Sequence, residues 1–584
     1  MPRPRAEAGR ADLVVASIAV LLAAADTYVV VLALPEIMTG VGLGLDELQR
    51  ASPIISMFLL GYVAVLPLAG RVADVRGRVP VLVACLLLFA LGSLLTASAE
   101  GLGVVVVGRA VQGAGGGGLV PVTIALVADL WAPDRRGVPL GVVGAVQELG
   151  SVAGPLYGAG VLALAGWRAI FWVNLAGAAA LVIVLAGRRS LRGTRFGVGR
   201  LLALLAVGVW CLVLVEPDAL TDDVTLGAAY VPLAGGWWSS PLALGAVALT
   251  VALVCVPGVR TSAGRLVREA DALGALLLGL ALGGVVLAFA QADPSRQVVS
   301  DAGPLLLAAS GACAALFAWR QRRAADPLVP HGSLRHPAAW GALAVNFFVG
   351  AALVAALVDV PVFARATRYP DSQLGAALVL VQLLVALPVG AVAGGWLCNR
   401  IPPRLVASAG MALATTGFAA MTQWDEGALD GAGSTLALVV TGLGFGLAIA
   451  PVNAALLAAT RPAVHGIASS LVVVARTVGM LVGLAALTGV GLRVFYSRQA
   501  EIGSPLTLCP DSPVDCPAYE VASRAALLDE LHAIFAGAGL CAAVAAVFAL
   551  TLLRPAEDVH DHEDVHDHEE VHDHEGGGGV KRGR

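Results

Sequence analysis

The chain has 584 residues, of which 58% are hydrophobic and 13% are charged, and its formal net charge is −4. This composition excludes an ordinary soluble globular protein, because polar residues are too few to cover its surface. Apolar runs of about 20 residues recur along the chain, and each is long enough to cross a bilayer as a helix. We therefore predict an all-α, polytopic membrane protein.

Sixteen apolar runs are candidates for membrane segments, and they fall into three groups. The first six lie near 13–35, 51–70, 80–98, 102–130, 137–163 and 169–187, and the last six near 338–363, 373–397, 405–422, 434–459, 466–493 and 529–553. Four more lie near 199–215, 239–257, 271–291 and 303–320. This pattern predicts a first six-helix half (1–190), inserted helices (191–335), a second half (336–555) and a tail (556–584). Because the runs within 199–257 either span or enter the membrane only in part, we expect 14–16 membrane segments.

The first run, Leu13–Leu34, contains Asp26 and lacks a small-residue cleavage site, so we expect a retained helix and not a removed signal peptide. Arginines gather in alternate loops. By the positive-inside rule, we expect these loops and both chain ends to lie in the cytoplasm and the helices in the cell membrane. The arginines are Arg71, Arg76, Arg78, Arg135, Arg136, Arg188, Arg189, Arg192, Arg195, Arg320, Arg322, Arg323, Arg400 and Arg404.

A short motif occurs once in each predicted half, after the second segment. The first copy is Gly70-Arg-Val-Ala-Asp74-Val-Arg76-Gly77-Arg78, and the second is Gly395-Trp-Leu-Cys-Asn399-Arg400. In both copies a glycine precedes Asp or Asn by four residues in a loop that carries arginine. Two six-helix halves related by such a repeat are typical of secondary transporters.

The segment Val138–Ala163 combines a titratable group with the features of a moving helix. Glu148 is its one residue that ionises near neutral pH, and an ionised carboxylate at bilayer depth usually marks an ion or proton pathway. Glycines at four-residue spacing form a flat face that another helix can approach, and Pro155 removes a helical hydrogen bond. The glycines of this segment are Gly141, Gly144, Gly150, Gly154, Gly158 and Gly160, of which Gly150, Gly154 and Gly158 have this spacing.

Three charges lie at similar depths in the predicted helices. At about 1.5 Å per residue from the cytoplasmic helix ends, Asp26, Glu148 and Arg476 each lie roughly 15–20 Å deep, near the middle of a core about 30 Å thick. We expect Arg476 of the second half to face both carboxylates of the first half in a switchable ion pair. Protonation of either carboxylate from outside would weaken this pair; a permanent salt bridge is the alternative.

Over essentially its whole length, the chain resembles the major facilitator superfamily of transporters. Gly70–Arg78 resembles the family's cytoplasmic gating motif, in which the Asp, here Asp74, pairs with a helix end and arginines of the other half. Val75 stands where the family usually has a basic residue, so Arg76 is expected to replace it. Gly70, Gly77 and Arg78 complete the predicted gate.

Motifs in two further helices resemble the same family. Arg109, Gln112 and Gly113 match the R-x-x-Q-G motif of its fourth helix; for Arg109 the alternative is a side chain that snorkels to the periplasmic surface. The sequence GSVAGPLYG is similar to the antiporter motif G-x-x-x-G-P-x-x-G. Its fixed positions are Gly150, Gly154, Pro155 and Gly158.

Two other stretches resemble the fourteen-helix drug:proton antiporter branch. Trp167–Asn174 matches W-R-x-I-F-x-x-N, and Asp26–Val31 is similar to L-D-x-x-I-V. Within this branch, the chain looks closest to mycobacterial triacylglyceride exporters, also described as multidrug efflux pumps, which work with a periplasmic lipoprotein. The chain departs from that branch in one respect: the branch normally has two helices inserted between its halves, whereas four apolar runs are found here.

This resemblance implies a proton-coupled antiporter that exports lipids such as triacylglycerides, or lipophilic drugs, by alternating access. It implies no enzymatic activity, no nucleic-acid partner and no cofactor besides the proton gradient. The expected partners are membrane lipids, the lipophilic substrate and a periplasmic lipoprotein, and the expected state is a monomer. A non-transporting scaffold that recruits envelope proteins is an alternative from another class.

The second half offers fewer candidates. Asp359 is either a cavity charge or an interfacial one, and Asn346 and Gln382 are candidates to line the cavity. The loop 492–528 has apolar and amphipathic flanks, so the last two helices are expected to extend beyond the membrane. Cys509 and Cys516 in this periplasmic extension are candidates for a disulfide.

The tail 556–584 repeats His-Asp-His among acidic residues. Such tracts bind transition metals, which suggests metal efflux as an alternative function. The favoured interpretation is a disordered cytoplasmic tail with adventitious metal affinity, because it has little apolar surface to bury. Its histidines are His560, His562, His566, His568, His572 and His574.

Overall fold

The computed structural model describes residues 3–554, apart from 44–47, 52, 189–207, 211–212, 214–224, 227–228, 231–240, 256–267, 291–299, 301, 331, 333, 371 and 510–515. Within them, thirteen helices are long and apolar enough to cross a membrane. A fourteenth span is formed by α1 (Arg3–Gly40), whose two parts meet at 68°. The predicted all-α fold is therefore confirmed, at the lower limit of the predicted 14–16 segments.

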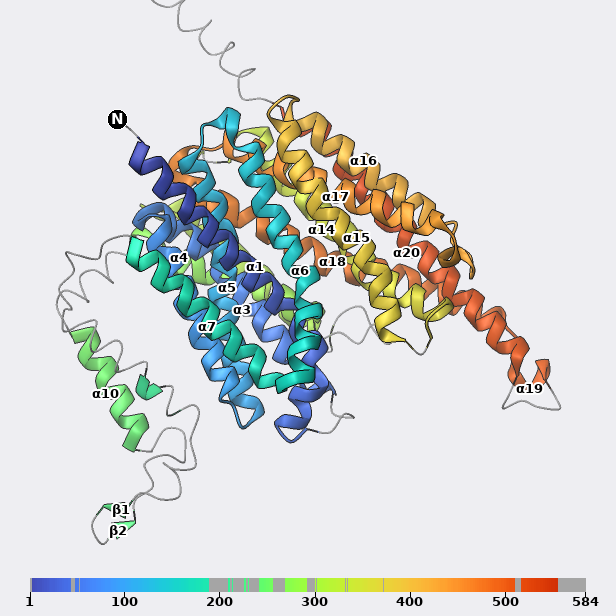
Figure 1. The fold of residues 1–584 in the computed structure, drawn as a ribbon, viewed down its shortest axis with the longest axis horizontal. Helices are drawn as coiled ribbons and strands as arrows, with labels where there is room; N and C mark the ends of the chain where they lie inside the picture. Colours follow the sequence, from blue (N-terminus) through green and yellow to red (C-terminus); the bar gives the residue numbers. More distant parts are fainter. Residues whose placement is uncertain are drawn as a thin grey trace, which may run out of the picture.

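Twelve of the membrane helices form two groups of six, one before and one after the inserted helices in the chain (Figure 1). Each group surrounds an apolar core, in which aromatic side chains such as Phe89 and Phe418 are fully buried. The first group contains α1, α3 (Pro53–Arg76), α4 (Arg78–Ala97), α5 (Leu102–Leu130), α6 (Gly137–Ala165) and α7 (Trp167–Arg188). The second contains α14 (Pro337–Thr367), α15 (Gln373–Cys398), α16 (Pro403–Met421), α17 (Ala432–Ala458), α18 (His465–Glu501) and α20 (Pro517–Leu552). The short elements are α2 (Leu48–Ala51), η2 (Pro133–Arg135), η3 (Ala428–Asp430), η4 (Pro462–Val464) and α19 (Pro505–Leu508).

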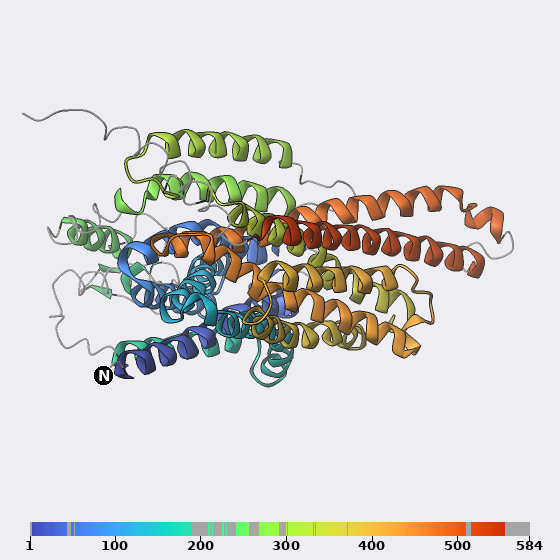
Figure 2. The same ribbon diagram turned by 90° about the horizontal axis from the view of Figure 1, so that it is seen from above.

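Two inserted helices, α12 (Ala272–Ala290) and α13 (Gly303–Arg323), lie side by side at one edge of the bundle (Figure 2). An ion pair of 2.7 Å between Asp271 and Arg320 ties the start of α12 to the end of α13. These helices correspond to the predicted segments 271–291 and 303–320.

The other two predicted inserted segments do not add described spans. The run 239–257 contains α10 (Pro241–Cys255), whose 15 residues cover about 22 Å and fall short of a core about 30 Å thick. The run 199–215 lies largely outside the described residues. Between these runs, the strands β1 (Thr225–Leu226) and β2 (Ala229–Tyr230) pair antiparallel.

The two halves are in backbone contact at the end of the bundle where α3 and α15 finish and α6 and α18 begin. We call it the Asp74 end. A Cβ atom at Gly70 would lie 2.4 Å from the carbonyl oxygen of Gly466, and one at Gly395 would lie 2.4 Å from that of Gly137. The two copies of the repeated motif thus occupy equivalent contacts, α3 against α18 and α15 against α6. Glycine is required in both because a side chain would separate the helices.

The last two membrane helices are longer than a bilayer requires. α18 has 37 residues and α20 has 36, so each is about 55 Å long, against a core about 30 Å thick. Both run past their neighbours towards α19 (Figures 1 and 2). Cys509 and Cys516, at this far tip, are joined in a disulfide with their Cα atoms 5.6 Å apart. These lengths agree with the expected extension of the last two helices.

Replacing Gly141 with Val should disturb the contact between α6 and α15, because a Cβ atom there would lie 2.4 Å from the Ala391 carbonyl oxygen. Overpacking of this kind costs about 1–3 kcal/mol, so we expect a lower melting temperature of the purified protein in detergent. Gly160→Val on the same helix is the matched control, since no described atom lies within 4 Å of a Cβ atom at that position. Equal melting temperatures for the two variants would contradict the close contact at Gly141.

Candidate functional site

Glu148 on α6 and Arg476 on α18 form an ion pair that joins the two halves. Arg476 Nη2 lies 2.7 Å from Glu148 Oε1. The Glu148 side chain is 7% exposed and the Arg476 side chain is 16% exposed, so both are enclosed but still border open space. Each residue lies about 17 Å from the start of its helix, which agrees with the depth estimated from the sequence.

The open space beside this pair is a cavity of about 220 Å³ between the two halves. Its walls come from α1, α3, α5, α6, α14 and α18, and most of the lining side chains are apolar. An apolar cavity with few polar groups at fixed positions suits an apolar or amphiphilic molecule. Besides the ion pair, the polar lining residues are Thr27, Tyr62, Gln147, Ser151 and Thr477.

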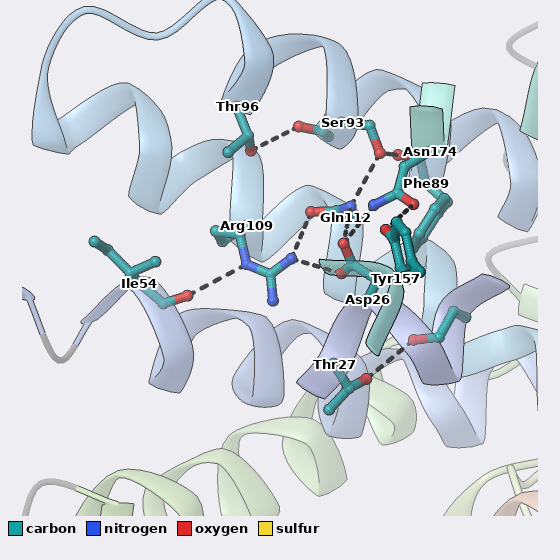
Figure 3. A network of polar contacts seen from close by, with 12 residues as sticks. Asp26, Thr27, Ile54, Phe89, Ser93, Thr96, Arg109, Gln112, Tyr157 and Asn174 are labelled. Carbon is teal, nitrogen blue, oxygen red and sulfur yellow. Dashed lines mark hydrogen bonds and ion pairs between the residues drawn. The ribbon is translucent and has the colours of Figure 1, made fainter. Parts of the chain in front are cut away.

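Asp26 on α1 belongs to a second ion pair, which lies entirely inside the first half (Figure 3). Its Oδ2 accepts a hydrogen bond from Arg109 Nη1 at 2.6 Å. Its Oδ1 accepts hydrogen bonds from Gln112 Nε2 at 3.0 Å and from Asn174 Nδ2 at 2.5 Å. The Asp26 side chain is 0% exposed and that of Arg109 is 1% exposed. Three donors from α5 and α7 therefore hold this carboxylate away from water.

This geometry corrects one expectation from the sequence and excludes one alternative. Asp26 does not face Arg476, because it points into the first half, where Arg109, Gln112 and Asn174 surround it. Arg109 does not snorkel to the surface: its guanidinium carbon lies 4.1 Å from the centre of the Phe58 ring. Phe58 also lines the central cavity, so this residue contacts both the cavity and the guanidinium of Arg109.

The glycines of α6 serve two different contacts. Those of the antiporter motif face α1, where a Cβ atom at Gly154 would lie 2.5 Å from the Ala25 carbonyl oxygen. Gly141 and Gly144 face the second half instead. Glu148 lies between the two sets along the helix. Before this residue α6 packs against the second half, and after it α6 packs against α1 of its own half. Gly150 and Gly158 also contact α1, Gly113 contacts α3, and the side chain of Pro155 lies outside the described atoms.

Asp74 connects the two halves at the Asp74 end. Its carboxylate accepts hydrogen bonds from the backbone nitrogens of Gly466 at 2.8 Å and Ile467 at 3.0 Å, in the first turn of α18. A carboxylate is stabilised there because the first N–H groups of a helix have no intrahelical acceptor and the helix dipole is positive at this end. The predicted contact with a helix end of the other half is present.

The arginine partner of Asp74 differs from the expectation. Arg78, on α4 of the same half, binds Asp74 and also lies 3.0 Å from Asp129 at the end of α5. The turn between α3 and α4 makes this possible: Gly77 has φ 90°, a conformation that favours glycine, and brings Arg78 back over Asp74. Arg76, the expected substitute, ends α3 in an exposed position.

The remaining candidates lie apart from the central cavity. Asn346 lines a smaller hollow that it shares with Arg476 and Asn453. Asp359 is buried on α14 and Gln382 lies on α15, and neither lines the central cavity. The tail histidines, His560 to His574, fall outside the described residues.

Sequence reasoning gave no pairing role to two residues that form ionic or hydrogen-bonded contacts, Asn174, which it named only as a motif position, and Asp129. Asn174 had a detectable signal, because it lies three and seven residues after Phe171 and Trp167 and therefore on the same buried face of α7. Asp129 had none: a carboxylate at the end of an apolar helix is usually solvated, and its contact with Arg78 depends on the packing of α4 against α5.

Comparisons of the sequence with known proteins give consistent results. Residues 16–291 match the family model described as Major Facilitator Superfamily. A triacylglyceride transporter of Mycolicibacterium hassiacum is 36% identical over 583 residues, covering 96% of this chain and 95% of that protein. A triacylglyceride transporter of Mycobacterium tuberculosis is also 36% identical, covering 84% of each chain.

Solved structures resemble the fold at low sequence identity. The proton:xylose symporter XylE has a TM-score of 0.52 at 14% identity, covering 94% of this chain and 96% of that chain. The human organic anion transporter MFSD10 has a TM-score of 0.50 at 17% identity, covering 94% and 99%. At these identities the likeness concerns the fold alone.

Replacing Asp26 with Asn should destabilise the protein strongly, because Arg109 would keep its charge in a site closed to water. Removing one partner of a buried ion pair costs about 3–5 kcal/mol. The double variant Asp26→Asn/Arg109→Gln should regain part of this loss, which a double-mutant cycle on the free energy of unfolding in mixed micelles would measure.

Asp529→Asn is the control for this cycle, because Asp529 pairs with Arg498 at 2.9 Å with both side chains largely exposed. Exposed pairs contribute about 0–1 kcal/mol. A loss at Asp26 no larger than the loss at Asp529, or no coupling between Asp26 and Arg109, would contradict this assignment.

Proposed function

Since the chain belongs to the major facilitator superfamily, we propose that this multi-pass membrane protein exports lipids, with triacylglycerides as the favoured class, in exchange for protons. The observation that carries the proposal is the apolar cavity between the halves, with the Glu148–Arg476 pair in its wall. Relatives named triacylglyceride transporters match almost the whole chain and support the choice of substrate class. The same apolar walls support lipophilic drugs as further substrates.

Glu148 is the proposed proton acceptor because its ion pair has access to the cavity. Protonation removes the charge of Glu148 and breaks its ion pair with Arg476, which is costly where no water can reach the guanidinium. Arg476 is 16% exposed in this wall, so cavity water can solvate the guanidinium when the pair separates. The Asp26–Arg109 pair has no such access and serves in the proposal as a fixed structural pair.

The two halves then move relative to each other between two arrangements. In the structure the Asp74 end is closed by the hydrogen bonds from α18 to Asp74 and by the glycine contacts of α3 and α15. We assign this end to the cytoplasmic side of the bacterial inner membrane, following the arginine distribution, which puts both termini in the cytoplasm. The closed end then corresponds to a state open towards the periplasm, in which Glu148 exchanges its proton with the outside.

The long α18–α20 pair is assigned to the periplasmic side, where it would shield a lipid product or pass it to a lipoprotein. Releasing a lipid into water costs a free energy of about 25 cal/mol for every Å² of apolar surface that becomes exposed. Exposed apolar side chains along this extension support such a contact: Val490, Tyr496, Leu506, Leu508 and Val521. Monomeric function is part of the proposal.

The residues that the structure describes offer no support for metal ions as the cargo. Among the described residues, no three His, Cys, Asp or Glu side chains are grouped so that they could hold a metal ion. The proposed role of the tail 556–584 is that of a cytoplasmic segment which transport does not require.

Glu148→Gln should abolish proton-driven export, because the amide cannot release and rebind a proton. The measurement is triolein transport in proteoliposomes with an imposed pH gradient, with a lipophilic dye tested in parallel. We expect transport by this variant to fall to the level of protein-free liposomes, at an unchanged elution profile of the purified protein. Glu36→Gln is the control, since Glu36 is exposed on α1. Undiminished gradient-driven transport by the Glu148 variant would refute its role in coupling.

Deleting Ser504–Tyr519 and joining the ends with a short Gly-Ser linker should impair lipid export more than dye export. A soluble dye can leave through water, whereas a lipid product needs the apolar outer surface. Export is compared in cells and in liposomes at matched expression. Cys509→Ser/Cys516→Ser is the control that removes the disulfide and keeps the chain. An equal loss of lipid export and dye export would contradict the lipid-transfer role and leave the extension with a role in packing alone.

A further inference from the structure

A second large apolar cavity lies outside the central one, between α3 and the inserted helices α12 and α13. Its volume is about 720 Å³, within the range of roughly 300–1,000 Å³ that is usual for ligand sites. α3 separates the two cavities: Leu59 and Tyr62 line the central one, whereas Leu60 and Ala64 line this outer one. We call it the α12–α13 cavity.

The walls of this cavity carry no charged side chain. They consist of Ala, Gly, Leu and Val residues, together with Cys313 and Ser310. Glycines on α12 create part of the space, since a Cβ atom at Gly283 would lie 2.4 Å from Leu60 Cδ1. An uncharged, mainly hydrocarbon ligand fits such walls, because a charged group would lose its hydration without gaining a partner.

Ser310 supplies the one polar observation that points to a ligand. Its side chain is 6% exposed and lines the cavity, and its Oγ has no hydrogen-bond partner among the described residues. A buried hydroxyl without a partner costs about 1–3 kcal/mol. A ligand that brings a carbonyl oxygen to this position removes that cost by accepting the hydrogen bond.

The depth of Ser310 selects among ester-bearing lipids. Ser310 lies about 10 Å from the start of α13 at Gly303 and about 20 Å from its end at Arg323, so the hydroxyl is well inside the membrane span. The esters of a phospholipid are tied to a charged headgroup that stays at the water interface. A neutral glyceride has ester groups and no charge, and can place an ester at this depth.

We propose that the α12–α13 cavity binds a neutral glyceride, with the Ser310 hydroxyl donating a hydrogen bond to one of its ester carbonyls. This inference rests on the proposed lipid export for the identity of the ligand. It adds a second binding site, on the side of α3 that faces away from the central cavity, where a substrate molecule dissolved in the bilayer is held beside the transporter.

Photolabelling of the full-length protein in phosphatidylcholine nanodiscs tests the site without any proton gradient. The probe is triolein with a diazirine in one acyl chain, and the comparison probe is phosphatidylcholine with the same diazirine chain. We expect the triolein probe to label peptides of α12 and α13 saturably and to be displaced by unlabelled triolein. Labelling that does not saturate, or is equal with both probes, would identify ordinary bilayer lipid and overturn the proposal.

Two pairs of variants assign the labelling to this cavity. Ser310→Ala should raise the half-saturating triolein concentration about two- to tenfold through loss of one hydrogen bond, whereas Ser310→Thr keeps the hydroxyl and the affinity. Ala309→Trp should fill the cavity and abolish saturable labelling. Its matched control on α13 is Leu305→Trp, at a 74% exposed position outside the cavity. Unchanged labelling of both Ser310→Ala and Ala309→Trp would refute the site.

An export assay on the same proteins separates this inference from the proposed function. Saturable labelling of a wild-type protein that exports no triolein would support the α12–α13 site and refute lipid export. Export by the wild-type protein without saturable labelling of α12 and α13 would refute the site and leave the proposed function standing. Modification of the lining thiol Cys313 by N-ethylmaleimide gives a second readout. Triolein should protect this thiol, so that peptide mass spectrometry finds more unmodified Cys313 when triolein is present.

Discussion

The interior of a membrane offers an isolated charge no water, and this constraint decides which helices must lie next to one another here. Asp26 requires donors from α5 and α7, so it fixes the packing of the first half. Glu148 requires Arg476, so it brings α6 of one half to α18 of the other. Asp74 uses the first turn of the same α18. One helix of the second half, α18, therefore receives both of these contacts from the first half.

The two deep ion pairs differ in access and not in chemistry. Asp26 and Arg109 are fully buried, whereas Glu148 and Arg476 border the cavity. A pair that water can reach is able to separate at a moderate cost, and one that water cannot reach is held together by desolvation. The same carboxylate–guanidinium interaction thus stabilises one half in the first case and provides a reversible joint between halves in the second.

Much of the fold and part of the site could be predicted from the sequence. Apolar runs set the spans, and the repeated Gly-x-x-x-Asp/Asn motif indicated two related six-helix halves. That its glycines lie in the contacts α3–α18 and α15–α6 is known only from the structure. Counting residues placed Glu148 and Arg476 at equal depth, and they pair. Counting could not show which way a side chain points, so Asp26 was assigned to the wrong arginine. The Asp74–Arg78 contact depends on the turn at Gly77, and the burial of Arg109 on the ring of Phe58; neither leaves a periodic signal.

The continuity of α18 has a mechanical consequence. This single helix carries the contact with Asp74 near its start, Arg476 about 17 Å further on, and the outer tip about 38 Å beyond Arg476. A rigid rod that turns about an intermediate point moves its two ends in opposite directions, each in proportion to its arm. With arms of about 17 and 38 Å, any shift of the inner end is roughly doubled at the outer tip. If α18 moves as a rigid rod about the level of Arg476, it acts as a lever whose longer arm ends beside the disulfide-closed loop.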